Sequence, residues 1–472
     1  MKYPLVSKVF AIGMVAAILG LVMLRIDGLV GERRMRQQQA MQGVEQSLSG
    51  PQMLMGPILH RACVEQWETA VGEGKERTVA NNRRPFTLMA VPRTLQVQSE
   101  AKSDVRHRGL FKVNTYAGPM TLEARWDDFS ALQPVREHPG SRLECGPALA
   151  MLSVSDVRGL RSARAQVAGV PTPVRPGTGL PRYARGVHAE VPAARIAETA
   201  EPLTARFALD LAGTSSLSLV PAASQTDWSV KSDWPHPSFG GRFLPARREV
   251  AASGFSAHWT VSELASTAAA AVQRDGELCE PRLAASTEDD EANSGAPNAK
   301  CLETLRVSFI DPVNPYVLTD RATKYALLFI ALTFTCVALA EILGRKRVHP
   351  VQYTLVGMAL ALFYLMLLSL SEHVAFGLAY FAASAGCVLL LGFYAGHMLK
   401  SRWAGAAFGT GVGALYGFLW VLLSLEQAAL MVGSLLLFGV LAAVMVLTRR
   451  VDWYALVEGW RAEQPRPAAV QA

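Results

Sequence analysis

The second part of the chain, from Tyr325 to Thr448, is almost continuously apolar, and this run constrains the fold more than any other feature. A helix needs roughly 20 apolar residues to cross about 30 Å of hydrocarbon. A soluble domain would not leave such stretches exposed, so we expect each of them to be a transmembrane helix. Six such stretches lie near residues 5–24, 325–343, 351–370, 374–396, 403–424 and 428–447.

The first of these stretches has the position of a signal peptide but not its details. Its apolar run is long for a signal peptide, and the flank LRIDGLVGERRMRQQQ has no A-x-A-like cleavage site. We therefore interpret residues 1–30 as an uncleaved N-terminal transmembrane anchor.

Basic residues in the short loops predict the orientation of the spans, because cytoplasmic loops carry an excess of Lys and Arg. GRKRVH (344–349), HMLKSR (397–402) and TRR (448–450) are basic, whereas SEH (371–373) and SLEQ (424–427) have no Lys or Arg. We therefore expect both termini to be cytoplasmic and the long region between the first two spans to lie outside.

Four arginines on the outer flank of the first span oppose this orientation. Long domains translocate largely regardless of charge, so the three concordant loops decide the prediction. The net charge of +7 then reflects topology and an arginine-rich outer region, and no nucleic-acid partner is expected. The opposing residues are Arg25, Arg33, Arg34 and Arg36.

The expected fold class is a multi-pass α-helical membrane protein with six transmembrane helices, one before and five after a large β-rich α+β domain. The expected limits are an anchor at 1–30, the outer domain at 31–320, a five-helix bundle at 321–450 and a cytoplasmic tail at 451–472.

The outer region shows strand patterns more often than helix patterns. Apolar and β-branched residues alternate or cluster between Gly, Pro and Asn in FKVNTY (111–116), MTLEARW (120–126), SLSLV (216–220) and LRVSFI (305–310).

Three further segments of the outer region carry other predictions. Residues 169–192 are so rich in proline that we expect a long connection without regular structure. Helices are expected at 32–48 and around 261–274.

Four cysteines fall in the outer region and two lie within spans. Cys279 and Cys301 bracket the acidic run EDDE (288–291), and a disulfide between them would suit an oxidising compartment. Buried free thiols are the alternative. The others are Cys63, Cys145, Cys336 and Cys387.

The stretch SDWPHPSFGGRFLPARREV (232–250) contains a histidine between two prolines. Proline fixes its own backbone and favours an extended residue before it, so WPHP should be rigid and extended. Trp234 and Phe239 are large enough to anchor a corner on a core. We interpret Trp234, His236 and Phe239 as a structural corner, with a partner-binding ridge as the alternative, because His236 has no evident catalytic partner.

Motifs for catalysis are missing from the sequence. We find no G-x-S-x-G, H-E-x-x-H or P-loop, and the histidines of the outer region have no ligand spacing. We therefore expect no enzyme, no cofactor and no metal. The spans also lack mid-membrane ionisable residues, which speaks against an ion-driven transporter.

Two features of the membrane half are candidate sites. Gly405, Gly409, Gly413 and Gly417 form a stripe that lets another helix approach closely, either within the chain or in a homo-oligomer. A polar cluster at the outer membrane face should link the outer domain to the bundle, with solvated helix ends as the alternative. Its residues are Asp320, Arg321, Lys324, Glu372 and His373.

Several long motifs resemble those of the bacterial inner-membrane CreD family. They are SGPQMLMGPIL (49–59), PGTGL (176–180) with GVH (186–188), SDWPHPSFGGRFLPARREV (232–250), SGFSAHW (253–259), DRATKYALLFIALTF (320–334), HPVQY (349–353), LSLSEH (368–373) and TRRVDWY (448–454).

The resemblance implies an inner-membrane protein of Gram-negative bacteria with a large periplasmic domain. It implies a role in cell-envelope integrity, within a two-component regulon, and no catalytic residue is carried over. The insert around 276–300, the glycine stripe and the tail after Trp460 depart from the family pattern.

The functional hypothesis is a periplasmic domain that binds an envelope component or another envelope protein, held at the lipid bilayer by the helices. One alternative is a transporter or exporter of lipid or amphipathic compounds through the bundle. Another is an envelope-stress sensor acting through a partner.

Overall fold

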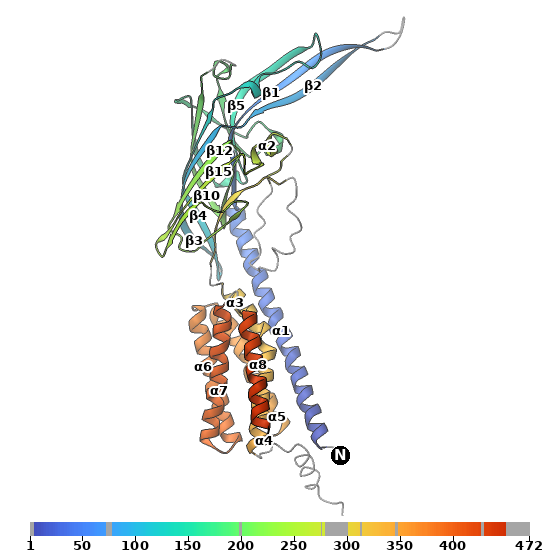
Figure 1. Ribbon diagram of the computed structural model, residues 1–472, viewed down its shortest axis with the longest axis vertical. Helices are drawn as coiled ribbons and strands as arrows, with labels where there is room; N and C mark the ends of the chain where they lie inside the picture. The colour runs from blue at the N-terminus through green and yellow to red at the C-terminus, as the bar shows by residue number, and fades with distance from the viewer. Residues whose placement is uncertain are drawn as a thin grey trace, which may run out of the picture. The chain divides into compact units, whose positions relative to one another are not determined.

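In the computed structural model the chain forms two compact units. The helix unit comprises residues 1–36 and 313–472, and the β unit comprises residues 37–312 (Figure 1). The described residues are 4–71, 78–197, 201–274, 276–278, 301–311, 314–344, 348–425 and 429–449.

In the described part of the chain, seven helices contribute to the helix unit. α1 is continuous over 44 residues, so the predicted anchor and the predicted helix at 32–48 form one element. Polar caps begin several of the others: the Asn314 side chain caps α3, His349 and Gln352 form a capping box on α5, and Ser401 caps α7. The bounds are α1 Pro4–Ser47, α3 Pro315–Lys324, α4 Ala326–Gly344, α5 Pro350–Ser371, α6 Phe376–Met398, α7 Arg402–Ser424 and α8 Ala429–Thr448.

Among the described residues, four helices are long and apolar enough to cross a membrane: α1, α5, α6 and α7. The pair α3 and α4 makes a fifth if this bent pair, with an angle of 47° between its helices, is one span. The apolar part of α8 is Met431–Val446, which is shorter. The structure thus supports four to five spans where the sequence predicted six.

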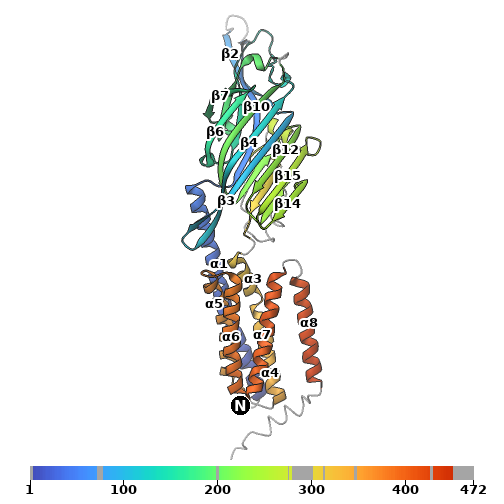
Figure 2. The same cartoon turned by 90° about the vertical axis from the view of Figure 1, so that its left-hand side faces the viewer.

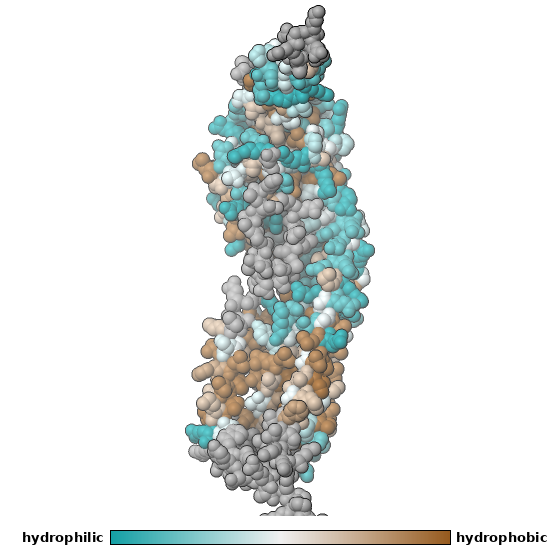
Figure 3. All heavy atoms as spheres, turned by 90° about the vertical axis from the view of Figure 1, so that its right-hand side faces the viewer, coloured by the Kyte–Doolittle hydropathy of each residue, from teal (hydrophilic) through white to brown (hydrophobic). Residues whose placement is uncertain are grey.

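The helix unit has an apolar surface as well as an apolar core. Its core packs α1, α4, α5, α6 and α7 around buried aromatic rings such as Tyr353, Phe363 and Tyr364. Apolar side chains also gather on the outside of these helices, whereas polar residues dominate the surface of the β unit (Figure 3). An apolar exterior is what a bilayer requires of the helices that cross it.

The β unit is a sandwich of two eight-stranded sheets. One sheet has the order β13-β16-β11-β1-β5-β9-β8, with β2 on β1, and the other has β14-β15-β12-β3-β4-β10-β6-β7 (Figure 2). The strands are β1 Gln52–Val71, β2 Thr78–Ala90, β3 Thr94–Arg108, β4 Phe111–Trp126, β5 Arg142–Val154, β6 Leu160–Val167, β7 Val170–Thr172, β8 Val174–Pro176, β9 Gly186–Val191, β10 Leu203–Thr214, β11 Ser216–Val220, β12 Gln225–Ser232, β13 Pro237–Gly241, β14 Arg247–Ala251, β15 Gly254–Ser262 and β16 Leu305–Phe309.

One apolar core lies between the two sheets. Leu54 and Leu219 come from the first sheet, and Leu122, Trp228 and Trp259 come from the second. β3 shows the alternation that this packing requires, because every second side chain of its first half is buried. β11 is buried along its whole length, since a second cluster covers the other face of its sheet.

Short 3₁₀ turns and one short helix connect or cover the strands. The helix α2, Ala268–Gln273, packs Ala268 and Val272 into the second cluster with Met53 and Tyr183. The 3₁₀ turns are η2 Ser130–Leu132, η3 Val157–Gly159, η4 Pro181–Tyr183 and η5 Ala193–Arg195.

Some local predictions are confirmed and others are wrong. Strands at 216–220 and 305–310 are β11 and β16, and the two patterns at 111–126 form the single strand β4. The prediction of an irregular connection over 169–192 is wrong, because β7, β8 and β9 pair there with β6 and β5. The helix expected at 261–274 is mostly absent, since β15 extends to Ser262 and α2 begins only at Ala268.

Candidate functional site

A two-stranded arm extends from the β unit. β1 is 20 residues long and pairs with β2 along 59–71 and 78–90, whereas β5 accompanies β1 only as far as the pair Gln66 and Arg142 (Figure 1). Beyond that pair, the described residues of β1 and β2 form strand pairs only with each other. We call the residues 66–71 and 78–83 the β1–β2 arm.

The base of the arm is braced by a disulfide and a buried carboxylate. Cys63 of β1 and Cys145 of β5 form the disulfide. Glu65 is fully buried, and its Oε1 accepts hydrogen bonds from the Ser141 hydroxyl at 2.6 Å and from the backbone N–H groups of His138 at 2.9 Å and Glu137 at 3.0 Å. The loop before β5 is thereby fastened to β1.

These donors also set the charge state of the buried carboxyl. The hydrogen bond from Ser141 is the largest cause that lowers the pKa of Glu65 to about 2, followed by the His138 backbone donor. Arg84 of β2 adds an ion pair, with Nη2 3.0 Å from Glu65 Oε2. Glu65 is therefore ionised at any physiological pH and links three segments of the chain.

Stacking interactions continue the brace on the same face of the arm. The Trp67 and His138 rings stack with centroids 3.7 Å apart, and the guanidinium of Arg84 lies over the Phe86 ring at 4.9 Å. Arg84 also forms an ion pair with Glu137. The hydrogen bond between these two side chains is the largest cause that raises the pKa of Arg84. Such a brace makes the arm a stiff projection.

The opposite face of the arm is polar and exposed. Arg83 of β2, Gln66 of β1 and Arg142 of β5 are opposite one another in register, and all three are exposed. Glu68 and Asn81 form the next cross-strand pair on this face and are exposed too. This flat strip of donors and acceptors can bind a polar partner.

The predicted corner lies at the edge of the first sheet. Trp234 is half-buried, and its Nε1 donates to the His236 and Ile310 carbonyls at 3.0 Å each. Phe239 lies in β13 and meets the rings of Phe255 and Trp259 edge-on. His236 itself is exposed. Both large rings pack against the core, whereas the histidine ring does not.

The predicted polar cluster gains partners from α1. Asp320 pairs with Arg34 at 3.3 Å and with Lys324 at 3.4 Å. Glu372, whose side chain is 8% exposed, pairs with Arg33 at 3.3 Å. These ion pairs fasten α1 to α3 and to the turn after α5.

The two remaining members of the predicted cluster lie differently. His373 is exposed and its Nδ1 bonds the Ser369 carbonyl at 3.2 Å. Arg321 is half-buried on α3. The structure thus brings Asp320, Lys324 and Glu372 into ion pairs that include two of the arginines which opposed the predicted orientation.

The glycine stripe on α7 divides into two halves. A Cβ at Gly405 would lie 2.5 Å from Gly396 Cα of α6, and one at Gly409 would lie 3.3 Å from Gly392 Cα. Gly413 would make ordinary contact with Val388, and Gly417 faces open space. The first half therefore permits close packing of α6 on α7.

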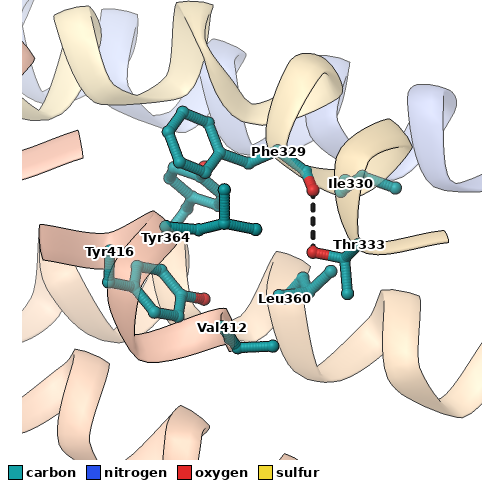
Figure 4. Close-up of a pocket in the computed structure, with 8 residues that line it drawn as sticks. Phe329, Ile330, Thr333, Leu360, Tyr364, Val412 and Tyr416 are labelled. Atoms are coloured by element: carbon teal, nitrogen blue, oxygen red, sulfur yellow. Dashed lines mark hydrogen bonds between the residues drawn. The ribbon is translucent and has the colours of Figure 1, made fainter. Parts of the chain in front are cut away.

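A small cavity lies inside the helix unit (Figure 4). Its volume is ≈ 10 Å³, which is about what the centre of one water molecule needs. Thr333 donates to the Phe329 carbonyl at 2.8 Å, and the Tyr416 hydroxyl donates to Cys387 Sγ at 3.3 Å. A lipid chain does not fit in this cavity.

The described part of the chain contains no group of three or more His, Cys, Asp or Glu residues that could hold a metal ion. The predicted Cys279–Cys301 disulfide cannot be placed, because Cys279 lies outside the described residues.

Residues of the motifs SGPQMLMGPIL and PGTGL form hydrogen bonds within the β unit. Gln52 donates to the Asp156 and Ala212 carbonyls at 3.0 and 3.2 Å, just after α1 ends. In the PGTGL turn the Thr178 carbonyl accepts from buried His60 at 2.7 Å. Burial lowers the pKa of His60, so this ring is neutral.

The residues of the arm were missed in the sequence. Glu65 and Arg84 are charged residues within long strands, and a charged residue in a strand pattern indicates an exposed face. A single sequence gives no signal that pairs Cys63 with Cys145 or places Glu65 beside Arg84.

Comparisons with known proteins agree with this architecture. The family described as Inner membrane protein CreD matches residues 4–454. The chain belongs to the CreD family. It is 34% identical to the Inner membrane protein CreD of Escherichia coli (strain K12) over 456 residues, which is 96% of this chain and 95% of the relative.

The crystal structure of the M1 zinc metallopeptidase from Deinococcus radiodurans aligns with a TM-score of 0.18 and 12% identity, over 36% of this chain and 38% of that chain. This likeness is too weak to carry an argument about fold or activity.

Proposed function

We propose that this CreD protein supports envelope integrity as a non-catalytic binding protein. The β unit binds an envelope component or partner protein through the exposed strip of the β1–β2 arm, and the helices hold it at the inner membrane. The observation that carries the proposal is the braced arm. A two-stranded ribbon is at best marginally stable in water, so the disulfide, the buried Glu65 and the stacked Trp67 keep this one in a fixed shape for recognition.

The proposal places residues 31–320 in the periplasm and both termini in the cytoplasm. The basic loops of the sequence support this orientation. The Cys63–Cys145 disulfide supports it independently, because such bonds persist in oxidising compartments and are rare in the cytosol.

Transport of lipid is the weaker candidate. The cavity of ≈ 10 Å³ between α4, α5 and α7 gives it no support, because its lining is closely packed. The first proposal therefore rests on the β unit alone.

The test uses charge reversal on the strip in a strain that lacks the protein. Arg83→Glu combined with Arg142→Glu should fail to rescue the strain's sensitivity to detergent, because the strip then loses its two cationic hydrogen-bond donors. Arg161→Glu combined with Arg164→Glu on β6 is the matched control, since both residues are exposed away from the arm. Full rescue by the arm variant, at equal protein level, would contradict the proposal.

A further inference from the structure

A second ribbon extends from the other sheet of the β unit, and it has a different character from the arm. β3 pairs with β12 only up to Ala101, and β4 pairs with β10 only from Thr115 onward. Between these points β3 and β4 pair only with each other, as far as the turn after Arg108. We call residues 105–113 the β3–β4 tip.

The chain enters and leaves the β unit at the base of this ribbon. The Gly50 carbonyl, just after α1, accepts from Thr214, and the Asn114 carbonyl accepts from Ser215. Ser215 in turn accepts from Phe309, at the end of the last strand before α3. Both connections to the membrane helices thus leave the sandwich at one end, and the ribbon projects from that end.

The ribbon runs beside the C-terminal end of α1, within the β unit. Thr115 pairs with Thr214, which bonds Gly50 beyond the end of α1. Further along the ribbon, the Arg108 guanidinium packs so closely on Gly43 that a Cβ there would overlap it. Gly43 and Arg108 both belong to the β unit. The tip therefore lies beside the last turns of α1, at the end of the sandwich where the chain enters it.

The composition of the tip fits a lipid surface. Leu110 is 54% exposed and Val105 is 41% exposed. Around them lie the exposed cations Arg106, Arg108 and Lys112, and the nearby carboxylate of Asp104 is already paired with Arg106 at 3.0 Å. Cations beside exposed apolar side chains are typical of segments that bind anionic membrane surfaces.

We propose that the β3–β4 tip docks on the anionic lipid headgroups of the bilayer. The cations contact the phosphates and Leu110 enters the interface. Docking fixes the β unit against the membrane at a third point, besides the chain connections through α1 and α3. It does not depend on which partner the arm binds or on which side of the membrane the β unit lies.

The experiment measures the surroundings of Leu110 in the full-length protein in lipid nanodiscs. A fluorescent, environment-sensitive amino acid replaces Leu110, and the nanodiscs contain either phosphatidylcholine alone or added phosphatidylglycerol, with nitroxide-labelled headgroups as quenchers. Leu264 is the matched control position. Leu264 is 95% exposed and follows the last residue of β15. That end of β15 is level with the start of β3, so Leu264 lies at the end of the sheet opposite the tip.

We expect quenching and a blue shift at position 110 in phosphatidylglycerol, less of both in phosphatidylcholine, and neither at position 264. Each Lys or Arg near an anionic surface strengthens association roughly fivefold, so Arg106→Ala with Lys112→Ala should weaken docking roughly 25-fold. This variant leaves Arg108 on α1. Arg161→Ala with Arg164→Ala should change nothing.

Three outcomes would overturn the proposal. The first is an unquenched signal at 110 that matches the signal at 264 in both lipids. The second is equal quenching in both lipids, which would remove the recognition of anionic headgroups. The third is a blue-shifted signal without lipid quenching, which would show that protein covers the tip.

Discussion

The Cys63–Cys145 disulfide should contribute a large part of the stability of the β unit. It closes a loop with a sequence separation of 82 residues between β1 and β5. The chain entropy removed from the unfolded state by a loop of this length corresponds to about 4.5 kcal/mol at 25 °C. The double variant Cys63→Ser/Cys145→Ser should lose about that free energy of unfolding.

Urea unfolding of the purified full-length protein in detergent measures this loss. Tryptophan fluorescence reports on the sandwich core, because Trp228 and Trp259 are fully buried and stack with centroids 4.6 Å apart. With an m value of about 3 kcal/mol/M, the midpoint should fall by about 1.5 M. Cys336→Ser is the control, since this free cysteine lies in α4.

An unchanged midpoint in the double variant would refute the reasoning. It would mean that the unfolded chain is already constrained to the same extent without the disulfide, or that the arm and β5 are not joined as described. Mutation is preferred to a reducing agent here because a reductant would also act on other cysteines of the β unit.

Three further predictions concern other parts of the molecule. Gly405→Leu should destabilise the packing of α6 on α7 by about 1–3 kcal/mol in thermal unfolding, because its Cβ meets backbone at 2.5 Å, whereas Gly417→Leu should have little effect. Glu65 has a folded pKa of about 2 against an ordinary value of 4.5, so the stability it gives is present above pH 4.5 and is lost as the pH falls towards 2; Glu65→Gln should lose this pH dependence in acid unfolding. Arg33→Glu should lower the thermal midpoint, and adding Glu372→Arg should restore most of it, with a coupling of about 1 kcal/mol; no recovery would argue against the ion pair.

The helices could be predicted from the sequence because their signal is local. Apolar runs at 351–370 and 403–424 are α5 and α7 almost residue for residue. The number of transmembrane helices could not be predicted from the apolar runs alone. The bend between Lys324 and Ala326 depends on packing, which hydropathy does not report.

The β unit was predicted as a class but not in its details. β7 and β8 are edge strands that contain Pro171 and Pro176, and these prolines suppress the strand pattern although the backbone still pairs. The partner of Cys63 could not be deduced, since four cysteines allow three connectivities. The ion pairs of Arg33 and Arg34 join residues far apart in the chain, so the sequence showed only arginines that opposed the predicted orientation.

The measurement that tests the central claim most directly is rescue of a null strain's detergent sensitivity by residues 1–318 alone. This fragment keeps α1 and the β unit and removes the helices after α3 begins. The account predicts rescue, because binding by the β unit carries the function. Failure of a fragment that is stable, correctly inserted and disulfide-bonded would contradict the account and assign the function to the helix unit.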